Sequence, residues 1–289
     1  LPIIYTIKRP TKYLPKVAYT DIDYRSKLKP AGKVIRSFHD YKRTPASITL
    51  DRIIQSILKK KCIPKIATLV KSVNDLYILA KLQSKYKKKI IVVGMGELGL
   101  MTRLYNKSLL TYAAVSNTTK TAVGQLTVKQ MQSTRLYGLV GDDIQHSLSP
   151  KLHSKQTYIY QLWQTDDLEK FMFVFNWFKL LGASVTKPFK IDVIKYCDRL
   201  DTHARKIGAV NTLVRKNNQL IGYNTDWIGV DKVIGRYLKH KVVKILGKGG
   251  AGKAVAYAVK HNHGRRGEDF DVLVNATPVA DHLLVSPES

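Results

Sequence analysis

Three polar clusters in the second half of the chain contain residue types that can move a proton at a carbonyl or alcohol oxygen. Each cluster ends an apolar run of β-forming residues, and strand ends meet at the rim of an α/β sheet, where open sheets bind ligands. We therefore expect Lys190, Asn211 and Asp226 to meet at such a rim. The clusters read GASVTKPFK (182–190), IGAVNT (207–212) and IGYNTDW (221–227).

A lysine beside an aspartate suits proton transfer, because the carboxylate holds the ammonium in place and adjusts its proton affinity. Lys190 and Asp226 would form such a pair. The alternative is a surface ion pair, which contributes little to stability. Spacing alone does not choose between these interpretations.

Another candidate is Lys65, which interrupts the apolar run IPKIATLV (63–70). A lysine inside a buried strand loses hydration, which favours the neutral amine that imine formation with a ketone requires. His39 would be a nearby general acid or base, and Arg103 would hold a substrate carboxylate. The alternatives are a lysine stem that is buried while its charged head reaches solvent, and a structural histidine.

The elements that would position these residues in the first half are β-prone runs, several of them separated by helix-like stretches. Buried strands that alternate with amphipathic helices, such as 48–58 and 73–82, indicate a parallel α/β architecture. The six runs are PIIYTI, AYTDIDY, KVIRSFHD, IPKIATLV, KIIVVGM and YAAVS.

The composition bounds the partners and the size of the protein. The 289 residues are enough for two domains, and 49 Lys and Arg against 21 Asp and Glu give a formal charge of +28. This excess favours anionic partners in general. A nucleic-acid surface is not favoured, because the lysines are scattered and no nucleic-acid-binding motif accompanies them.

The cysteines and apolar runs indicate the compartment. Cys62 and Cys197 make no metal or disulfide pattern, which is typical of a reducing, cytoplasmic compartment. FMFVFNWF (171–178) is too short to cross a membrane and indicates a buried element. The first residues, LPIIYTIKRP, carry neither an initiator Met nor a signal-peptide layout, so we expect an interior piece of a longer multidomain chain.

The polar clusters, together with HSLSPKLH (146–153) and LGKGGAGKA (246–254), resemble the shikimate dehydrogenase family. The resemblance implies that Lys190 transfers a proton with Asp226 as its partner, and that NADP is the cofactor. A plain helix cap is the alternative for the S-x-S-P turn. The substrate-binding residues that the resemblance implies are Ser147, Ser149, Thr186 and Asn211.

The segment 241–261 has the strand, Gly-rich turn and helix order of a dinucleotide site. Beyond it, residues 261–271 are too few for a second strand, its helix and the return, which predicts a shortened Rossmann domain. Arg265 or Arg266 is a candidate for the arginine that selects the NADP phosphate. The cofactor-binding residues predicted here are Gly247, Gly249, Gly250, Ala251, Gly252, Asn275 and Thr277.

The first half resembles type I 3-dehydroquinate dehydratase, a (β/α)8 barrel that works through a lysine imine. The motifs that carry this are SFHDYKRTP, CIPKIATLV, VVGMGELGLMTR and TAVGQLT. The resemblance implies that Lys65 forms the imine and His39 transfers the proton. The matched substrate-pocket positions are Lys8, Met95, Arg103, Thr121 and Gln125.

Departures from this family leave the barrel apparently incomplete. The six runs match the third to eighth of eight strands, Lys8 replaces an arginine, and the acidic DxE element reads Asp21-Ile22-Asp23. An open six-stranded barrel would expose apolar edges. We therefore expect either that residues are missing from the chain or that a partner segment completes it.

The motif order resembles the plant bifunctional dehydratase-dehydrogenase and the C-terminal part of the fungal AROM polypeptide. It predicts a dehydratase-like barrel at 1–132, a shikimate dehydrogenase-like α/β domain at 133–238 and a partial Rossmann domain at 239–289. We expect dehydration of 3-dehydroquinate and NADPH-dependent reduction of 3-dehydroshikimate in the shikimate pathway, with a homodimer as one arrangement. The alternatives are a non-catalytic repressor of quinate use and a basic subunit of a nucleoprotein assembly.

Overall fold

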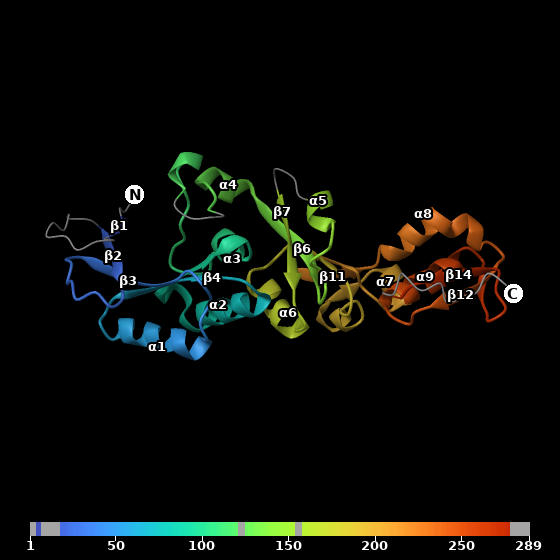
Figure 1. The fold of residues 1–289 in the computed structure, drawn as a ribbon, viewed down its shortest axis with the longest axis horizontal. Coiled ribbons are helices and arrows are strands. Elements are labelled where there is room, and N and C mark those ends of the chain that lie inside the picture. Colours follow the sequence, from blue (N-terminus) through green and yellow to red (C-terminus); the bar gives the residue numbers. More distant parts are fainter. Residues whose placement is uncertain (1–3, 7–17, 121–124, 154–157, 278–289) are drawn as a thin grey trace. The chain divides into compact units, whose positions relative to one another are not determined.

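The computed structural model describes residues 4–6, 18–120, 125–153 and 158–277. The chain forms two compact units, one from residues 1–136 and 148–180, the other from 137–147 and 181–289 (Figure 1). The domain boundaries at 132 and 238 stay a prediction. Lys8 and Thr121 lie outside the described residues.

The first unit is built on a parallel sheet with the strand order β1-β2-β3-β4-β5, which confirms the predicted parallel α/β architecture. The predicted sixth run, YAAVS, is not a strand. Ala114 within it makes only an isolated parallel bridge to Thr127. The strands are β1 (Ile4–Thr6), β2 (Tyr19–Asp23), β3 (Lys33–Asp40), β4 (Ile63–Leu69) and β5 (Ile91–Met95).

A helix follows each of the last three strands: α1 (Ser47–Leu58), α2 (Val73–Tyr86) and α3 (Gly96–Leu104). Helix α1 buries Leu50, Ile54 and Ile57, spaced four and three residues apart on one face. Helix α2 begins where the Ser72 hydroxyl accepts a hydrogen bond from the Asp75 amide, and its last turn leads into η1 (Lys87–Lys89). In Figure 1, α1 and α2 lie along one side of strands β3 and β4.

The connection between β2 and β3 has no helix, and the guanidinium of Arg36 holds it in place. Nη1 donates to the carbonyl oxygens of Tyr24 (3.3 Å) and Ser26 (2.7 Å), and Nη2 donates to that of Leu28 (3.1 Å). Arg36 is only 7% exposed. Because side chains alternate along a strand, the connection lies on the face of β3 opposite to Ser37.

The rest of the first unit contains η2 (Asn117–Thr119), α4 (Val128–Ser133), α5 (Ser149–His153), β7 (Tyr158–Gln164) and α6 (Leu168–Trp177). Helix α6 buries Phe171 and Phe175, so FMFVFNWF forms the expected buried element. The Trp177 indole donates to Gln83 of α2 at 3.2 Å. Within the described residues, each helix is too short or too polar to cross a bilayer.

Strands β6 (Arg135–Gly141), β8 (Gly182–Val185), β10 (Thr212–Lys216), β11 (Gln219–Tyr223) and β9 (Arg199–Leu200) lie side by side in that order. Strand β10 is antiparallel to both β8 and β11, whereas β6 is parallel to β8. Two short helices, η3 (Asp192–Tyr196) and α7 (Thr202–Ile207), connect these strands. Helix α7 ends at Gly208, whose φ of +68° suits glycine.

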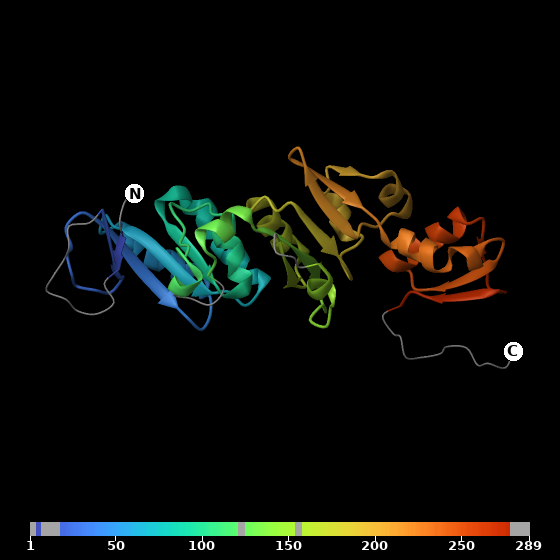
Figure 2. The ribbon, with the colours of Figure 1, turned by 90° about the horizontal axis from the view of Figure 1, so that it is seen from above.

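The last part of the second unit is a three-stranded parallel sheet with the order β13-β12-β14, beside which α8 (Asp226–Leu238) and α9 (Gly250–His261) pack together (Figure 2). Its strands are β12 (Val242–Leu246), β13 (Arg265–Arg266) and β14 (Val272–Asn275). The segment 261–271 was expected to be too short for a second strand, its helix and the return, and it contains only a two-residue strand, β13. Residues 267–271 then join β13 to β14 without a helix.

This strand order matches part of a doubly wound sheet. In the order 3-2-1-4, the first strand has the second and fourth as neighbours. Strands β12, β13 and β14 occupy those three positions. The predicted shortening of the Rossmann domain therefore falls at the third strand of this order. The switch point, where the strand order reverses beside the first strand, is retained.

Candidate active sites

The first candidate site is a buried lysine–aspartate pair in the first unit. Lys65 on β4 donates from Nζ to Asp21 Oδ2 on β2 at 2.7 Å, and their side chains are 10% and 1% exposed. Strand β3 runs between them, and its Ser37 hydroxyl donates to the other oxygen of Asp21. The predicted burial of Lys65 is confirmed, and the ammonium is paired rather than directed into solvent.

An aromatic ring also contacts the ammonium of Lys65. The Tyr112 ring centroid lies 4.3 Å from Nζ, within the range of a cation–π interaction. The Tyr112 hydroxyl is buried and makes no hydrogen bond with the described residues. Burial, and to a lesser degree the charge of Asp21, raises the pKa of Tyr112, which keeps this ring neutral beside the pair.

His39 lies on the same face of the sheet as Lys65, two residues beyond Ser37 along β3. Its ring is exposed and stacks on Tyr41, with centroids 5.8 Å apart. Burial raises the pKa of Asp23, but two hydrogen bonds from Arg25 and the positive field of His39 outweigh it, so the pKa is lowered. A carboxylate therefore faces His39 at the end of the strands.

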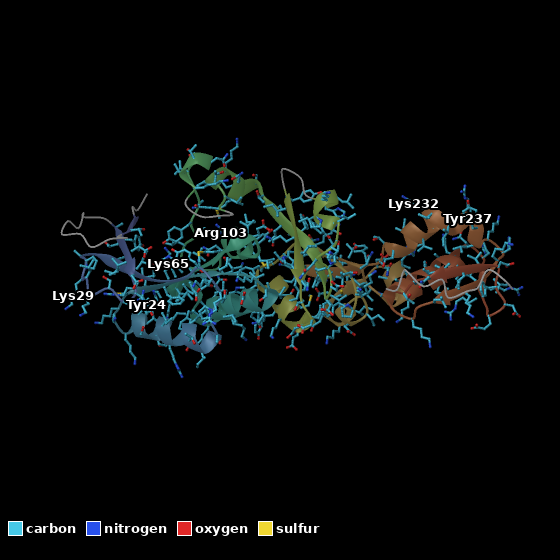
Figure 3. All side chains as sticks on the ribbon, viewed as in Figure 1. Tyr24, Lys29, Lys65, Arg103, Lys232 and Tyr237 are labelled. Carbon is cyan, nitrogen blue, oxygen red and sulfur yellow. The ribbon has the colours of Figure 1, made fainter. Side chains whose placement is uncertain are left out.

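The other predicted dehydratase residues come from elements that follow the strands. Arg103 on α3 is 5% exposed, and desolvation lowers its pKa (Figure 3). Met95 ends β5, and its carbonyl oxygen accepts from the Val70 amide at 3.1 Å. Gln125 is half-buried in the segment before α4.

The second candidate site confirms the predicted meeting of lysine, asparagine and aspartate. Lys190 Nζ donates to Asp226 Oδ2 at 2.6 Å, and Asn211 Nδ2 donates to Asp226 Oδ1 at 2.8 Å. The lysine and aspartate side chains are 16% and 29% exposed, so this pair remains in contact with solvent.

These three residues reach the rim in different ways. Lys190 follows β8, and Asp226 opens α8 shortly after β11, as expected. Asn211 does not end a strand. It precedes β10, and because β10 is antiparallel to β8 and β11, its start lies at the rim where they end.

Backbone contacts fix the orientation of the second pair. Asn211 Oδ1 accepts from the Thr225 amide at 3.0 Å, and Asn224 Oδ1 accepts from the Asp226 amide at 3.0 Å. The carboxylate also lies in the first turn of α8, where the helix dipole favours negative charge. The rotamers of Asn211 and Asp226 are thus set before any ligand arrives.

The remaining predicted substrate residues are half-buried; two of them follow strands and one begins a helix. Ser147 lies in the turn after β6, where its amide donates to the Ile144 carbonyl at 3.0 Å. Thr186 follows β8, and its amide donates to the Val140 carbonyl at 3.0 Å. Ser149 is the first residue of α5, as the S-x-S-P spacing predicts, and belongs to the first unit.

The Gly-rich turn between β12 and α9 is closed tightly on its own backbone. Gly247 has a φ of +107°, and a Cβ on Gly252 would lie 1.9 Å from the Gly247 carbonyl oxygen. A Cβ on Gly250 would lie 2.7 Å from Cβ of Lys190, whereas one on Gly249 would meet nothing within 4 Å. The first turn of α9 therefore packs against Lys190 and leaves its Gly249 side open; Ala251, the second residue of α9, is exposed.

A cavity of about 760 Å³ extends from this turn along α9 to β13. Glu268 is the one carboxylate that lines it among the residues described in the structure, and Lys244 already pairs with Glu268 at 2.8 Å. At the end of β14, Asn275 Oδ1 accepts from the amide and hydroxyl of Thr277 at 2.9 and 2.6 Å. The cations that line the cavity are Lys206, Lys248, Lys253, Lys260, Arg265 and Arg266.

Sequence reasoning missed Asp21, Ser37 and Tyr112 as site residues. The DxE element pointed to Asp21, but its partner lies 44 residues away and depends on strand register. Tyr112 had no signal, because its run was interpreted as a strand. No group of three or more metal-binding side chains occurs among the residues that the structure describes.

Comparison with known families divides the chain in the same way as its two sites. Residues 14–139 match the type I 3-dehydroquinase family, and residues 139–213 match the shikimate dehydrogenase substrate binding domain. The second match contains Lys190 and Asn211 and ends before Asp226.

Relatives of known function contain one or both regions. A chloroplastic bifunctional 3-dehydroquinate dehydratase/shikimate dehydrogenase of Arabidopsis thaliana is 32% identical over 79% of this chain and 44% of its own length. The pentafunctional AROM polypeptide of Schizosaccharomyces japonicus is 31% identical over 78% of this chain and 16% of its own length. A shikimate dehydrogenase (NADP(+)) of Clostridium beijerinckii is 39% identical over 43% of this chain and 51% of its own length.

The chain thus spans about half or less of the length of these relatives. The two family matches adjoin at residue 139, in the order that the motifs predict. In this chain a type I 3-dehydroquinase region precedes a shikimate dehydrogenase region. The chain is therefore a relative of the bifunctional dehydratase/dehydrogenases and AROM polypeptides.

Proposed function

We propose that the chain performs two reactions of the shikimate pathway: dehydration of 3-dehydroquinate at Lys65, and reduction of 3-dehydroshikimate with NADPH beside Lys190. The observation that carries the proposal is the burial of Lys65 in β4, paired with Asp21 and covered by Tyr112. Burying a lysine in a strand is costly, and Lys65 lies within the residues that match the type I 3-dehydroquinase family, whose motifs imply an imine lysine at this position.

Imine formation at Lys65 requires a neutral amine, so the ammonium must first lose a proton. Asp21 Oδ2, 2.7 Å from Nζ, is the nearest acceptor. The free amine then adds to the substrate ketone, and water leaves as the protonated imine forms. The positive charge draws electrons from the adjacent carbon, His39 removes the proton from that carbon, and the protonated His39 gives this proton to the substrate hydroxyl, which leaves as water. Hydrolysis of the imine returns the amine.

At the second site the residues of this chain would position the carbonyl and supply the proton. The ammonium of Lys190 donates a proton to the carbonyl oxygen as that oxygen becomes an alcohol. Asp226 holds the ammonium, and Asn211 fixes Asp226. Thr186 and Ser147, which belong to the same unit as Lys190, would bind the substrate hydroxyls and carboxylate. NADPH, when bound, supplies the hydride.

The Gly-rich turn fits a dinucleotide phosphate. The first turn of α9 contains no acidic side chain, and Gly249 leaves room for close backbone approach. Arg265 and Arg266 line the same cavity on β13. That placement supports their selecting the additional phosphate of NADP over NAD, and two shikimate dehydrogenase relatives carry NADP(+) in their names.

Borohydride trapping tests the first reaction, because the reagent reduces an imine to a stable secondary amine. Incubation with 3-dehydroquinate and borohydride should attach the substrate to Lys65, as located by peptide mass spectrometry. The matched control is Lys71→Met, which removes an exposed lysine just after the same strand. A folded protein that gives no adduct, or an adduct elsewhere, contradicts the dehydratase proposal and favours a non-catalytic binding protein.

The second reaction is tested separately by the loss of NADPH absorbance with 3-dehydroshikimate. We expect turnover in the unmodified chain and in Lys65→Met, because the second pair does not depend on the first. If the chain binds NADPH but shows no turnover, it is a cofactor-binding module without dehydrogenase activity. That result would contradict the second half of the proposal.

The proposed setting is a reducing, cytoplasmic-type compartment and a longer multidomain protein. Cys62 and Cys197 are both free thiols in the structure, which supports the first. The second is supported by relatives that carry both regions within longer chains.

A further inference from the structure

A second cavity, of about 630 Å³, lies between the β2–β3 connection and the residues that follow α1. Among the described residues, the side chains that line it include no carboxylate. Its apolar contribution comes from Leu28, Pro30 and Val34, and Cys62 lies at its wall. The cations that line it are Arg25, Lys27, Lys29, Arg36 and Lys60, of which Lys29 is labelled in Figure 3.

Arg36 is the buried member of this set. It uses three of its five N–H donors on backbone carbonyl oxygens, and its Nε is buried without a partner among the described residues. None of the ion pairs between described residues involves Arg36. A buried guanidinium without a counter-charge is unfavourable, so an anion in the adjacent cavity would be stabilised.

The other cations leave the cavity positive. Arg25 is partly neutralised by Asp23, at 3.2 Å. Lys27, Lys29 and Lys60 are exposed and form no ion pair within the part of the chain that the structure describes. At least four positive charges thus surround a space large enough for a small organic molecule.

We propose that this cavity binds a phosphorylated small molecule. A phosphate group carries about two charges near neutral pH and accepts several hydrogen bonds, which suits an arginine surrounded by lysines. Leu28, Pro30 and Val34 would contact the carbon part of the ligand. The site is separate from the Lys65 site, because Arg36 and Ser37 point to opposite faces of the sheet.

Alkylation of Cys62 gives a local measure of occupancy. Inorganic pyrophosphate is the probe, added at constant ionic strength, and the neutral reagent iodoacetamide is followed at each cysteine by peptide mass spectrometry. Bound pyrophosphate should slow alkylation of Cys62 in a saturable way. Cys197 is the internal reference: burial, together with the charge of Asp198, raises the pKa of its thiol to about 11, and it belongs to the second unit.

Matched variants separate a site from the general positive charge of the chain. Lys60→Gln removes a cation that lines the cavity, whereas Lys59→Gln removes its exposed neighbour, which does not. We expect Lys60→Gln to raise the pyrophosphate concentration for half-protection by about five-fold, and Lys59→Gln by less than about two-fold. Lys29→Gln should resemble Lys60→Gln.

Arg36→Gln is the stronger variant, but it also removes three contacts that hold the β2–β3 connection. The lysine variants therefore carry the test if Arg36→Gln does not fold. Equal half-protection concentrations in Lys59→Gln and Lys60→Gln, or no protection of Cys62 at millimolar pyrophosphate, would overturn the proposal.

Discussion

The two lysine–aspartate pairs of this protein have nearly the same length but different surroundings. Lys65 and Asp21 are 2.7 Å apart and at most 10% exposed, with an aromatic ring over the ammonium. Lys190 and Asp226 are 2.6 Å apart, up to 29% exposed, and held by the amide of Asn211. Distance alone therefore does not distinguish a lysine suited to covalent chemistry from one suited to proton transfer.

The difference in solvent exposure matches the proposed roles. In the buried pair, little water reaches Lys65, and in the proposed reaction Asp21 is the group placed to accept the proton that the lysine gives up before it attacks a carbonyl carbon. In the open pair, Lys190 can recover its proton from solvent after each turnover. We propose that burial sets the role of each lysine, and four changes test that proposal.

Replacing each lysine by methionine should give the largest contrast. Lys65→Met leaves the Asp21 carboxylate buried without a cation, so we expect the free energy of unfolding to fall by about 3–5 kcal/mol. Lys190→Met should cost about 1 kcal/mol or less, because Asp226 keeps its contact with water. Denaturant unfolding measures both. Adding Asp21→Asn to Lys65→Met should restore most of the loss; equal losses for the two lysines would remove the distinction.

Changing the second carboxylate should affect rate more than stability. Asp226→Asn removes the charge that holds Lys190, and we expect kcat for NADPH-dependent reduction to fall about 100-fold. Formation of the borohydride adduct at Lys65 should be unchanged in the same variant. A parallel loss of both signals would mean that the two sites do not act independently.

The contact between α9 and Lys190 predicts a position-specific effect in the Gly-rich turn. Gly250→Ala would place a Cβ 2.7 Å from Cβ of Lys190, so the lysine or the helix must move. We expect a loss of about ten-fold in kcat/KM for reduction, in line with a displaced proton donor. Gly249→Ala meets nothing within 4 Å and is the matched control for stability, measured by thermal unfolding. A kcat/KM for reduction equal to that of the unmodified chain would show that Lys190 tolerates the shift.

The smallest expected effect concerns the ring over Lys65. Tyr112→Phe keeps the ring and removes a buried hydroxyl that makes no hydrogen bond with described residues, so stability should be unchanged or higher by about 1 kcal/mol. Tyr112→Leu removes the cation–π contact and should cost about 1–2 kcal/mol beyond the loss of packing. A large loss in Tyr112→Phe would indicate that the hydroxyl acts through a bound water.

The sequence predicted the lysines of both sites but only one of their two carboxylates. Asp226 follows a β-prone run by three residues, so it could be assigned locally. The pairing of Asp21 with Lys65 requires three strands in register, which local patterns do not specify. Asn211 was predicted to end a strand, but it precedes one. It lies at the expected rim because β10 is antiparallel to β8 and β11 and begins where they end.

Two short segments were assigned incorrectly from the sequence. YAAVS has the composition of a strand, but only Ala114 pairs, because backbone pairing depends on a neighbour that the run itself does not supply. Strand β13 was missed for the opposite reason: Arg265 and Arg266 have low strand propensity, and their pairing with β12 follows from the tertiary fold.

Arg36 makes one stretch of backbone depend on a single side chain. Elsewhere in the first sheet a helix follows each strand from β3 onward, but the β2–β3 connection is held by three hydrogen bonds from this guanidinium. Such a segment can open locally while the sheet stays folded. Its amides should exchange with deuterium sooner than those of β3 and β4. Occupancy of the adjacent cavity by an anion would slow that exchange, so the connection would report ligand binding without any change in the strands.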